Sequence, residues 1–175
     1  MNLALVGFMG SGKSTVGRAA AQRLELAFVD SDAAVEARAG MPIPDIFARR
    51  GEEGFRRLER ETLLALCDEQ GLLIATGGGA FMQDDVRRKL LETSLVVYLE
   101  APFDVLWERI HGDPHRPLLA GEGAYQRARA LFERRRPVYE QAHRRVDAAK
   151  SPGQVVEELV EVYHAWRERS AQPRR

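Results

Sequence analysis

The stretch Gly7-Phe8-Met9-Gly10-Ser11-Gly12-Lys13-Ser14 matches the phosphate-loop pattern G-x-x-x-x-G-K-[ST] at every fixed position. The apolar run 3–6 before it predicts a short buried strand, and residues 14–24 after it predict a helix. Strand, glycine loop and helix therefore come in the order that the motif requires. Such a loop points several backbone N–H groups at phosphate oxygens, and the helix N-terminus adds partial positive charge. The stretch predicts a binding site for a nucleoside triphosphate.

The polar side chains of this loop have expected partners on the nucleotide. Lys13 is expected to reach the β- and γ-phosphates, and the Ser14 hydroxyl is expected to bind Mg²⁺. The alternative is a glycine-rich turn that contains Lys-Ser by coincidence, and the flanking strand and helix argue against it. The residues predicted to contact ATP in this segment are Gly10, Ser11, Gly12, Lys13, Ser14 and Thr15.

Composition limits the class of protein. The chain has 175 residues, of which 45% are hydrophobic and 30% are charged, so we expect one globular domain over residues 1–175. The formal net charge is zero, which gives no bulk electrostatic sign of a nucleic-acid or membrane surface. The single cysteine, Cys67, cannot form an internal disulfide, and no apolar run approaches the length of a membrane span. We therefore expect a cytoplasmic protein without nucleic-acid or membrane partners.

Short apolar runs alternate with helical patterns along the whole chain. Such alternation predicts an α/β fold with a central parallel sheet of five strands, flanked by helices on both faces. Ligands of such sheets bind at the carboxyl ends of the strands. The predicted strands are 3–6, 27–29, 72–75, 95–99 and, more weakly, 144–147; the predicted helices are 14–24, 32–38, 44–50, 52–69, 84–92, 102–110, 124–142 and 153–168.

Three predicted strands end in residues that suit phosphate transfer. The first strand ends at the phosphate loop, the second at Asp30-Ser31-Asp32, and the third at Thr76-Gly77-Gly78-Gly79. Because the carboxyl ends of parallel strands meet at one edge of the sheet, these segments are expected to converge on one crevice.

The two aspartates after the second strand have separate expected roles. Asp30 is expected to hold Mg²⁺ through water, as acidic residues at strand ends do in this architecture. Asp32 is expected to accept or orient the proton of an attacking hydroxyl. The alternative is that one of them is only the N-cap of the helix that begins near Ala33. Their place beside a phosphate loop favours the functional interpretation.

The run Gly77-Gly78-Gly79 suits neither a helix nor a strand, because ordering three glycines carries a large entropy cost. It offers backbone N–H groups that no side chain obstructs, and these can donate to a substrate oxygen. A plain loop is the alternative.

Residues 112–123 form a long stretch of residues typical of turns and loops, with glycines at both ends and prolines within. This composition predicts a mobile lid. Arg116 in this segment is expected to stabilise the charge of the transferring phosphoryl group.

Two arginine clusters remain ambiguous from spacing alone. Arg56, Arg57 and Arg60 lie among glutamates at helical spacing, so intrahelical ion pairs are the simplest expectation. In the run Arg134-Arg135-Arg136, one side chain could point into the crevice, and the pattern does not indicate which.

Several of these elements, taken in order, resemble the shikimate kinases over nearly the whole chain. A phosphate loop alone occurs in many unrelated proteins, whereas the ordered combination is specific. The elements that carry the resemblance are Gly7–Arg18, Asp30-Ser31-Asp32, Phe55-Arg56 with Glu59, Thr76–Ala80, Arg116-Pro117-Leu118-Leu119 and Arg135-Arg136-Pro137-Val138-Tyr139.

The resemblance implies a P-loop kinase fold with a mobile lid, in a monomer that uses ATP and one Mg²⁺ per subunit to phosphorylate the 3-hydroxyl of shikimate. It assigns the shikimate carboxylate to Arg56 and Arg135, and the ring hydroxyls to Asp32. It assigns a backbone N–H contact to Gly78 within Gly77-Gly78-Gly79. It also implies that Arg109 packs on adenine, that Lys150-Ser151-Pro152 forms the adenine loop, that Arg116 covers the phosphates, and that residues 32–60 form the substrate-binding segment.

Two other interpretations remain open at this point. Another small-metabolite kinase of the same architecture, such as a gluconate kinase or a nucleoside monophosphate kinase, would share the phosphate loop and the lid. An inactive nucleotide-binding module is the second, although it would be expected to lack Lys13, Asp32 or Arg116, and all three are present.

Overall fold

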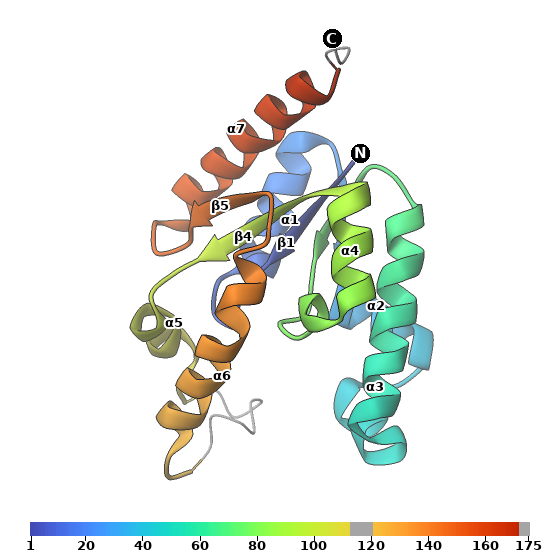
Figure 1. Ribbon diagram of the computed structural model, residues 1–175, viewed down its shortest axis with the longest axis vertical. Coiled ribbons are helices and arrows are strands. Elements are labelled where there is room, and N and C mark those ends of the chain that lie inside the picture. Colours follow the sequence, from blue (N-terminus) through green and yellow to red (C-terminus); the bar gives the residue numbers. More distant parts are fainter. Residues whose placement is uncertain (113–120, 172–175) are drawn as a thin grey trace.

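The computed structural model describes residues 1–112 and 121–171, and its elements follow one another as alternating strands and helices (Figure 1). The strands are β1 (Asn2–Val6), β2 (Ala27–Asp30), β3 (Leu72–Ala75), β4 (Ser94–Glu100) and β5 (Arg144–Asp147). The helices are α1 (Lys13–Leu24), α2 (Ser31–Ala39), α3 (Ile43–Asp68), α4 (Asp84–Thr93), α5 (Phe103–Ile110), α6 (Ala124–Tyr139) and α7 (Pro152–Ala171), with a 3₁₀ turn η1 (Ala80–Met82).

The five strands form one sheet in the order β2-β3-β1-β4-β5, and every neighbouring pair is parallel. Strand β1 lies between β3 and β4 and is buried along its full length, which is why its sequence is continuously apolar after Asn2. The predicted central five-stranded parallel sheet is confirmed. From β1 the chain passes to the edge strand β2, returns through β3 and then crosses to β4 on the other side of β1. The strand order therefore changes direction around the carboxyl end of β1, where ligands of such sheets bind.

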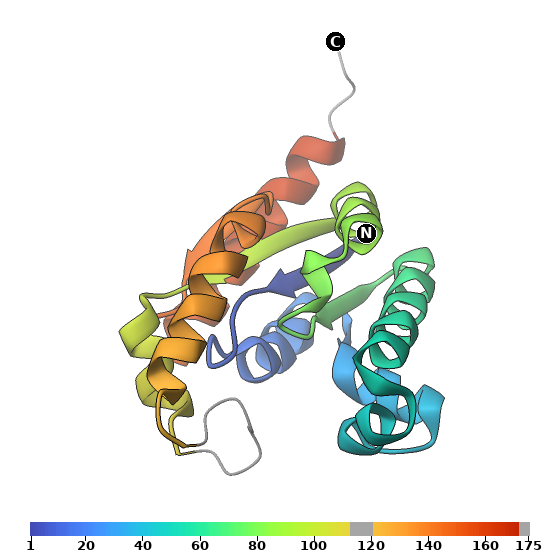
Figure 2. The ribbon, with the colours of Figure 1, turned by 60° about the horizontal axis from the view of Figure 1, so that its bottom comes forward.

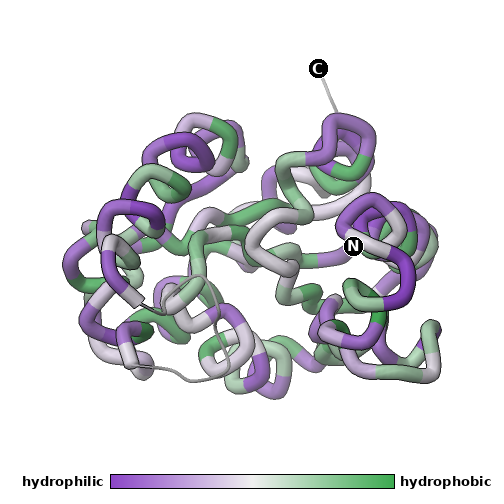
Figure 3. Tube along the Cα trace, turned by 90° about the horizontal axis from the view of Figure 1, so that it is seen from below, coloured by the Kyte–Doolittle hydropathy of each residue, from purple (hydrophilic) through white to green (hydrophobic). Residues whose placement is uncertain are grey.

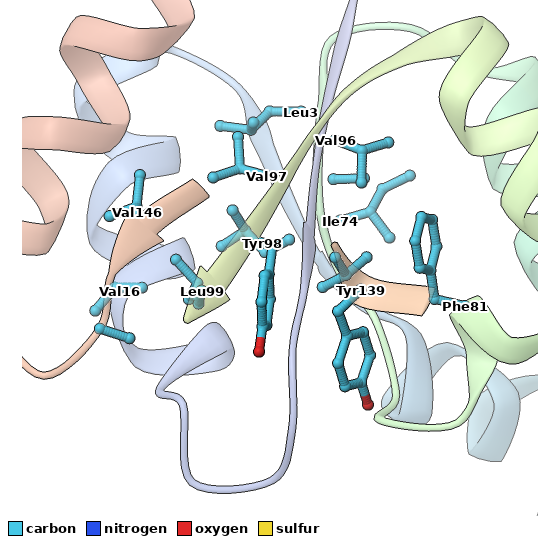
Figure 4. Packing of buried hydrophobic residues seen from close by; sticks show 14 of the residues in the cluster. Leu3, Val16, Ile74, Phe81, Val96, Val97, Tyr98, Leu99, Tyr139 and Val146 are labelled. Carbon is cyan, nitrogen blue, oxygen red and sulfur yellow. The ribbon is translucent and has the colours of Figure 1, made fainter. Parts of the chain in front are cut away.

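Helices cover both faces of the sheet. Helices α1 and α7 pack together on one face, while α4 and α6 lie on the other (Figures 1 and 2). Hydrophobic stretches concentrate in the centrally placed strands, and the surrounding helices turn hydrophilic residues outward (Figure 3). The buried side chains of β1 and β4 meet those of α1, α6 and β3 in one large core (Figure 4).

A smaller apolar cluster stabilises α2 against the first turns of α3, beyond the edge strand β2. Its buried members are Val35, Ile46, Phe55 and Leu58. This pair of helices carries most of the predicted substrate-binding segment 32–60, and Figure 2 shows it projecting beside one edge of the sheet.

The helices predicted at 44–50 and 52–69 are confirmed as two helical segments of α3, which are separated at Gly51 by non-helical backbone with φ of 68° and ψ of −177°. The structure corrects two other details of the predicted elements. Helix α6 ends at Tyr139, three residues earlier than predicted, because the chain turns there through a hydrogen bond from Ala142 N–H to the Tyr139 carbonyl. The turn η1 was not predicted; its first bond runs from Ala80 N–H to the Gly77 carbonyl.

Within residues 1–112 and 121–171, no helix is long and apolar enough to cross a membrane. Most of the predicted lid, including Arg116, lies outside the described residues. The lid therefore stays a prediction.

Candidate active site

The phosphate loop connects β1 to α1 with an open helix N-terminus. Gly10 has φ of 82°, and a Cβ at this position would lie 2.6 Å from the Ile110 side chain, so only glycine fits here. Gly12 is the N-cap of α1, and no side chain caps the helix. Among the described residues, the backbone N–H groups of Ser14 and Thr15 have no hydrogen-bond partner. They are available to phosphate oxygens at the positive end of the helix dipole.

The Lys13 ammonium group folds back over this loop. Its Nζ atom donates to the Gly7 carbonyl at 2.7 Å and to the Phe8 carbonyl at 3.1 Å, and lies 3.4 Å from Ser11 Oγ. The lysine charge is therefore held within the loop that would surround a phosphate chain.

Asp30 and Ser14 meet at this end of the sheet. The Ser14 hydroxyl donates to Asp30 Oδ2 at 2.6 Å, while Asp30 Oδ1 accepts from the backbone N–H of Asp32 at 3.0 Å. Asp30 is thus the N-cap of α2, as the alternative interpretation expected, and it also contacts the phosphate loop.

A hydroxyl and a carboxylate at this distance suit Mg²⁺. This ion keeps several waters and needs only one or two protein ligands beside substrate phosphates. Among the described residues no group of three or more His, Cys, Asp or Glu side chains could hold a metal alone. The donors present therefore fit a Mg²⁺ ion whose remaining ligands come from nucleotide and water.

Asp32 lies next to the glycine run. Its carboxyl group has a pKa raised to about 6: burial is the largest cause, the nearby carboxylates of Asp30 and Glu59 add to the rise, and Lys13 opposes it. A Cβ at Gly77 would lie 2.6 Å from Asp32 Oδ1, so the loop packs directly against this carboxyl group. A carboxyl group with this pKa, beside a phosphate loop, can accept a proton near neutral pH.

Arg56 is anchored by a buried carboxylate. Its Nη1 atom lies 2.7 Å from Glu59 Oε2, and the Glu59 side chain is 1% exposed. Gln83 also donates to Glu59 Oε2, at 2.9 Å. The expected intrahelical pair is present, but its acid is in the interior rather than on a solvated face. Such burial fixes the guanidinium group while leaving part of it exposed to the site.

The exposed arginines of the same helix behave differently. Arg57 pairs with Glu53 one turn away at 3.7 Å, as spacing predicts, and is 68% exposed. Arg60 pairs instead with Asp85 on α4, so the expectation of an intrahelical pair is wrong there.

Two adjoining cavities meet at the glycine run. The first, of about 310 Å³, is lined by Lys13, Ser14, Asp30 and Asp32 together with Gly77 and Gly78. The second, of about 360 Å³, is lined by Glu52, Arg56, Gly79, Gln83, Arg134 and Arg135, among others. Consecutive glycines line the two cavities, so the glycine run lies at the border between the phosphate side and the arginine side.

The structure separates the three consecutive arginines of α6. Arg134 and Arg135 line the cavity that contains Arg56. Arg136 points to another side, where it pairs with Glu133 at 3.4 Å. It lines a larger polar hollow of about 650 Å³ between α5, α6 and β5, which contains none of the predicted site residues. The assignment of Arg135, rather than Arg136, to the site agrees with this arrangement.

Arg109 joins the phosphate loop to the predicted adenine loop. Its guanidinium group donates to the Gly10 carbonyl at 3.2 Å and to the Ala148 carbonyl at 2.8 Å. The Lys150 side chain turns away toward α7, where it pairs with Glu158 at 2.7 Å. The structure therefore brings Arg109 to the nucleotide side but does not bring the Lys150 ammonium group there.

Sequence reasoning did not single out two polar residues that support the site. Ser31 is fully buried, and its Oγ atom accepts from the Gly77 N–H at 2.8 Å. Gln83 reaches Glu59 from the turn after η1. Neither belongs to a pattern of its own, and only the meeting of distant segments reveals them.

Comparison with known proteins identifies a family for this chain. The family model described as shikimate kinase matches residues 9–164. The chain belongs to the shikimate kinase family. A shikimate kinase of Aromatoleum aromaticum is 44% identical over 161 residues, which cover 91% of this chain and 92% of that protein. The resemblance stated from the sequence motifs is confirmed.

Among solved structures, a shikimate kinase matches this chain more closely than a gluconokinase does, both in TM-score and in sequence identity. The shikimate kinase from Acinetobacter baumannii, solved in complex with shikimate, has a TM-score of 0.87 and 36% identity, covering 98% of this chain and 95% of that chain. A gluconokinase from Sinorhizobium meliloti has a TM-score of 0.62 at 22% identity, covering 96% and 94%. The gluconokinase shares only the fold, so membership in the shikimate kinase family rests on the closer matches.

Proposed function

We propose that the protein transfers the γ-phosphoryl group of ATP to the 3-hydroxyl of shikimate, giving shikimate 3-phosphate and ADP. The observation that carries this proposal is the glycine run that separates a phosphate-loop cavity from a cavity lined by Arg56 and Arg135. One cavity suits a phosphate chain and the other a carboxylate, as transfer between ATP and a hydroxy acid requires. Family membership supports shikimate as that acid.

At the nucleotide end, we assign the ATP phosphates to the backbone N–H groups of the phosphate loop and to Lys13. Ser14 and Asp30, the latter through water, would hold Mg²⁺. When bound, this ion neutralises charge on the β- and γ-phosphate oxygens. Arg109 is placed to pack on the adenine base from its position between the Gly10 and Ala148 carbonyls. Arg116, over the phosphates, stays a prediction.

At the acceptor end, we assign the shikimate carboxylate to the guanidinium groups of Arg56 and Arg135, which can bind it with paired hydrogen bonds. The backbone N–H groups of Gly78 and Gly79 have no hydrogen-bond partner among the described residues, so both can donate to the substrate. Asp32 would accept from a ring hydroxyl.

The proposed reaction proceeds in one transfer. The 3-hydroxyl oxygen of shikimate bonds to the γ-phosphorus, and the bond between that phosphorus and the β,γ-bridging oxygen breaks. The hydroxyl proton passes to the Asp32 carboxylate, and ADP leaves. Lys13 stabilises the charge that moves onto the phosphate oxygens.

A panel of acceptors tests this function. We expect the purified protein, with ATP and Mg²⁺, to release ADP in the presence of shikimate and not with gluconate, quinate, AMP or no acceptor. Turnover with another acceptor would keep the nucleotide site but reject the roles of Arg56, Arg135 and Gly78. No turnover with any acceptor would favour an inactive nucleotide-binding module. A cytoplasmic location and a monomeric state stay predictions.

The pH dependence of kcat/KM tests the role of Asp32. Since burial and neighbouring carboxylates raise the pKa of this carboxyl group from 3.8 to about 6, protonation inactivates the base at a higher pH than for an exposed aspartate. We expect kcat/KM for shikimate to rise with pH through about 6 and then level off. An acidic limb centred near 4, where an ordinary aspartate titrates, would contradict the assignment of Asp32 as the base.

A further inference from the structure

Two tyrosines lie stacked in the core directly behind the candidate site. Tyr98 on β4 is 1% exposed, and Tyr139 at the end of α6 is fully buried. Their ring centroids are 5.4 Å apart at an interplanar angle of 25°, and both hydroxyls point the same way, toward the site end of the sheet (Figure 4). The two side chains therefore share one environment.

Their hydroxyls differ in one respect. The Tyr139 hydroxyl donates to the Gly78 carbonyl. The Tyr98 hydroxyl is buried and has no hydrogen-bond partner within the part of the chain that the structure describes. Burial raises the pKa of Tyr139 to about 12, so its hydroxyl keeps the proton that it donates. A buried donor aimed at the backbone of the substrate loop indicates a role beyond packing.

The carbonyl that Tyr139 holds controls a neighbouring N–H group. The Gly78 carbonyl and the Gly79 N–H belong to the same planar trans peptide and point in opposite directions. Fixing the carbonyl on Tyr139 therefore fixes the direction of the Gly79 N–H. Without this bond, consecutive glycines would allow the peptide to rotate through many conformations.

The glycine run is thus held at two points. Ser31 accepts from the Gly77 N–H at 2.8 Å, and Tyr139 donates to the Gly78 carbonyl. These two contacts leave the N–H groups of Gly78 and Gly79 without partners among the described residues. The loop is ordered by its neighbours while its two free donors remain available.

Tyr139 also links this loop to Arg135. The two residues are four apart on α6 and share a face of the helix. A Cβ at Gly78 would lie 3.3 Å from Arg135 Nη1 and 3.8 Å from the Tyr139 hydroxyl oxygen. Both side chains therefore lie close to Gly78, so the Tyr139 bond fixes the amide donors beside the Arg135 guanidinium group.

We propose that Tyr139 is a positioning residue for the acceptor substrate: its hydroxyl orients the Gly78–Gly79 peptide and registers it against Arg135. This inference rests on the proposed function. Arg135, which shares a helix face with Tyr139, lines the acceptor-side cavity, and Tyr139 itself does not line the phosphate-side cavity. We therefore expect the contribution of Tyr139 to act on acceptor binding.

The variants Y139F and Y98F form a matched pair, since each removes one hydroxyl from the same ring stack. For Y139F we expect KM for shikimate to rise about 3- to 10-fold, the value of one neutral hydrogen bond, with KM for ATP unchanged. Calorimetry without nucleotide should show the same loss of shikimate affinity. For Y98F we expect both KM values to stay at wild-type levels, because that hydroxyl has no partner to lose.

Three results would overturn the inference. Unchanged shikimate KM and affinity in Y139F would show that the hydroxyl does not position the loop. Equal rises in both KM values, or a lower melting temperature with both KM values unchanged, would show a general structural role. The same rise in Y98F would assign the effect to the ring stack. Wild-type protein assayed in parallel separates these results from a failure of the proposed function, which would show as no shikimate turnover in the wild type.

Discussion

Replacement of Asp32 by asparagine is expected to lower kcat with shikimate by about 10²- to 10⁴-fold, the usual contribution of a positioned general base. Asparagine keeps the shape of the side chain but cannot accept the hydroxyl proton. Asp32 and Lys13 line the same cavity, but the Lys13 ammonium group is also held by the Gly7 and Phe8 carbonyls of its own loop, so we expect ATP affinity to remain close to that of the wild type. Steady-state kinetics with shikimate and calorimetric titration with ATP measure both quantities.

The stability of the D32N variant provides the control. The pKa of Asp32 is raised from 3.8 to about 6 in the folded state, so the free energy of unfolding falls as the pH rises between these two values, and the destabilising effect of the ionised carboxylate is fully present above about 6. At pH 8 the melting temperature of D32N should therefore equal or exceed that of the wild type. The variant D45N, on the exposed first turn of α3, should retain full activity. A collapse of ATP affinity in D32N would contradict the role given to Asp32.

The nucleotide half of the site was predictable because its parts are local in sequence. A single stretch of strand, loop and helix brings Gly10, Gly12, Lys13 and Ser14 together, and residue types alone specify it. Parallel topology then explains why Asp30 meets Ser14, since both follow strands whose carboxyl ends lie at one edge of the sheet. The phosphate-loop motif and the rule that ligands bind at the carboxyl ends of parallel strands are enough to predict the nucleotide half of the site.

The acceptor half depends on packing between distant segments. Spacing could not choose among three consecutive arginines, because the choice follows from how α6 is rotated on the sheet. The burial of Glu59 could not be predicted from the sequence either, since a glutamate in a charged helix usually faces solvent. The partnership of Tyr139 with Gly78 joins residues 61 positions apart. No local pattern encodes such a contact.

Family resemblance supplied what spacing could not, and its assignments differ in how well the geometry supports them. Arg56 and Arg135 line one cavity, as the resemblance implied. The Lys150 ammonium group pairs with Glu158 on α7, so the geometry gives the least support to the assignment of Lys150 to the adenine loop. Arg56 and Arg135, which the family pattern assigns to the substrate, both lie beside the glycine run.

The double variant R56A/R135A is expected to raise KM for shikimate by about 10²-fold or more, because charge-assisted hydrogen bonds contribute about 1.5–3 kcal/mol each. Both guanidinium groups line the cavity beyond the glycine run, away from the phosphate loop. KM for ATP should therefore stay within about 3-fold of the wild type, a change of under 1 kcal/mol. Initial rates over a grid of ATP and shikimate concentrations separate the two constants.

Removal of Arg56 also leaves the buried Glu59 with Gln83 as its one hydrogen-bond partner among the described residues, which destabilises the fold whatever its effect on substrate. The variant R56K/R135K separates the two effects. Lysine keeps both charges but loses the planar fork that binds a carboxylate with paired hydrogen bonds. We expect a smaller rise in shikimate KM with little loss of stability. The exposed Arg57 and Arg136 serve as controls, since each already pairs with a glutamate on its own helix. An unchanged shikimate KM in both double variants, or an equal rise in R57A/R136A, would refute the carboxylate fork and assign the acceptor charge to another part of the cavity.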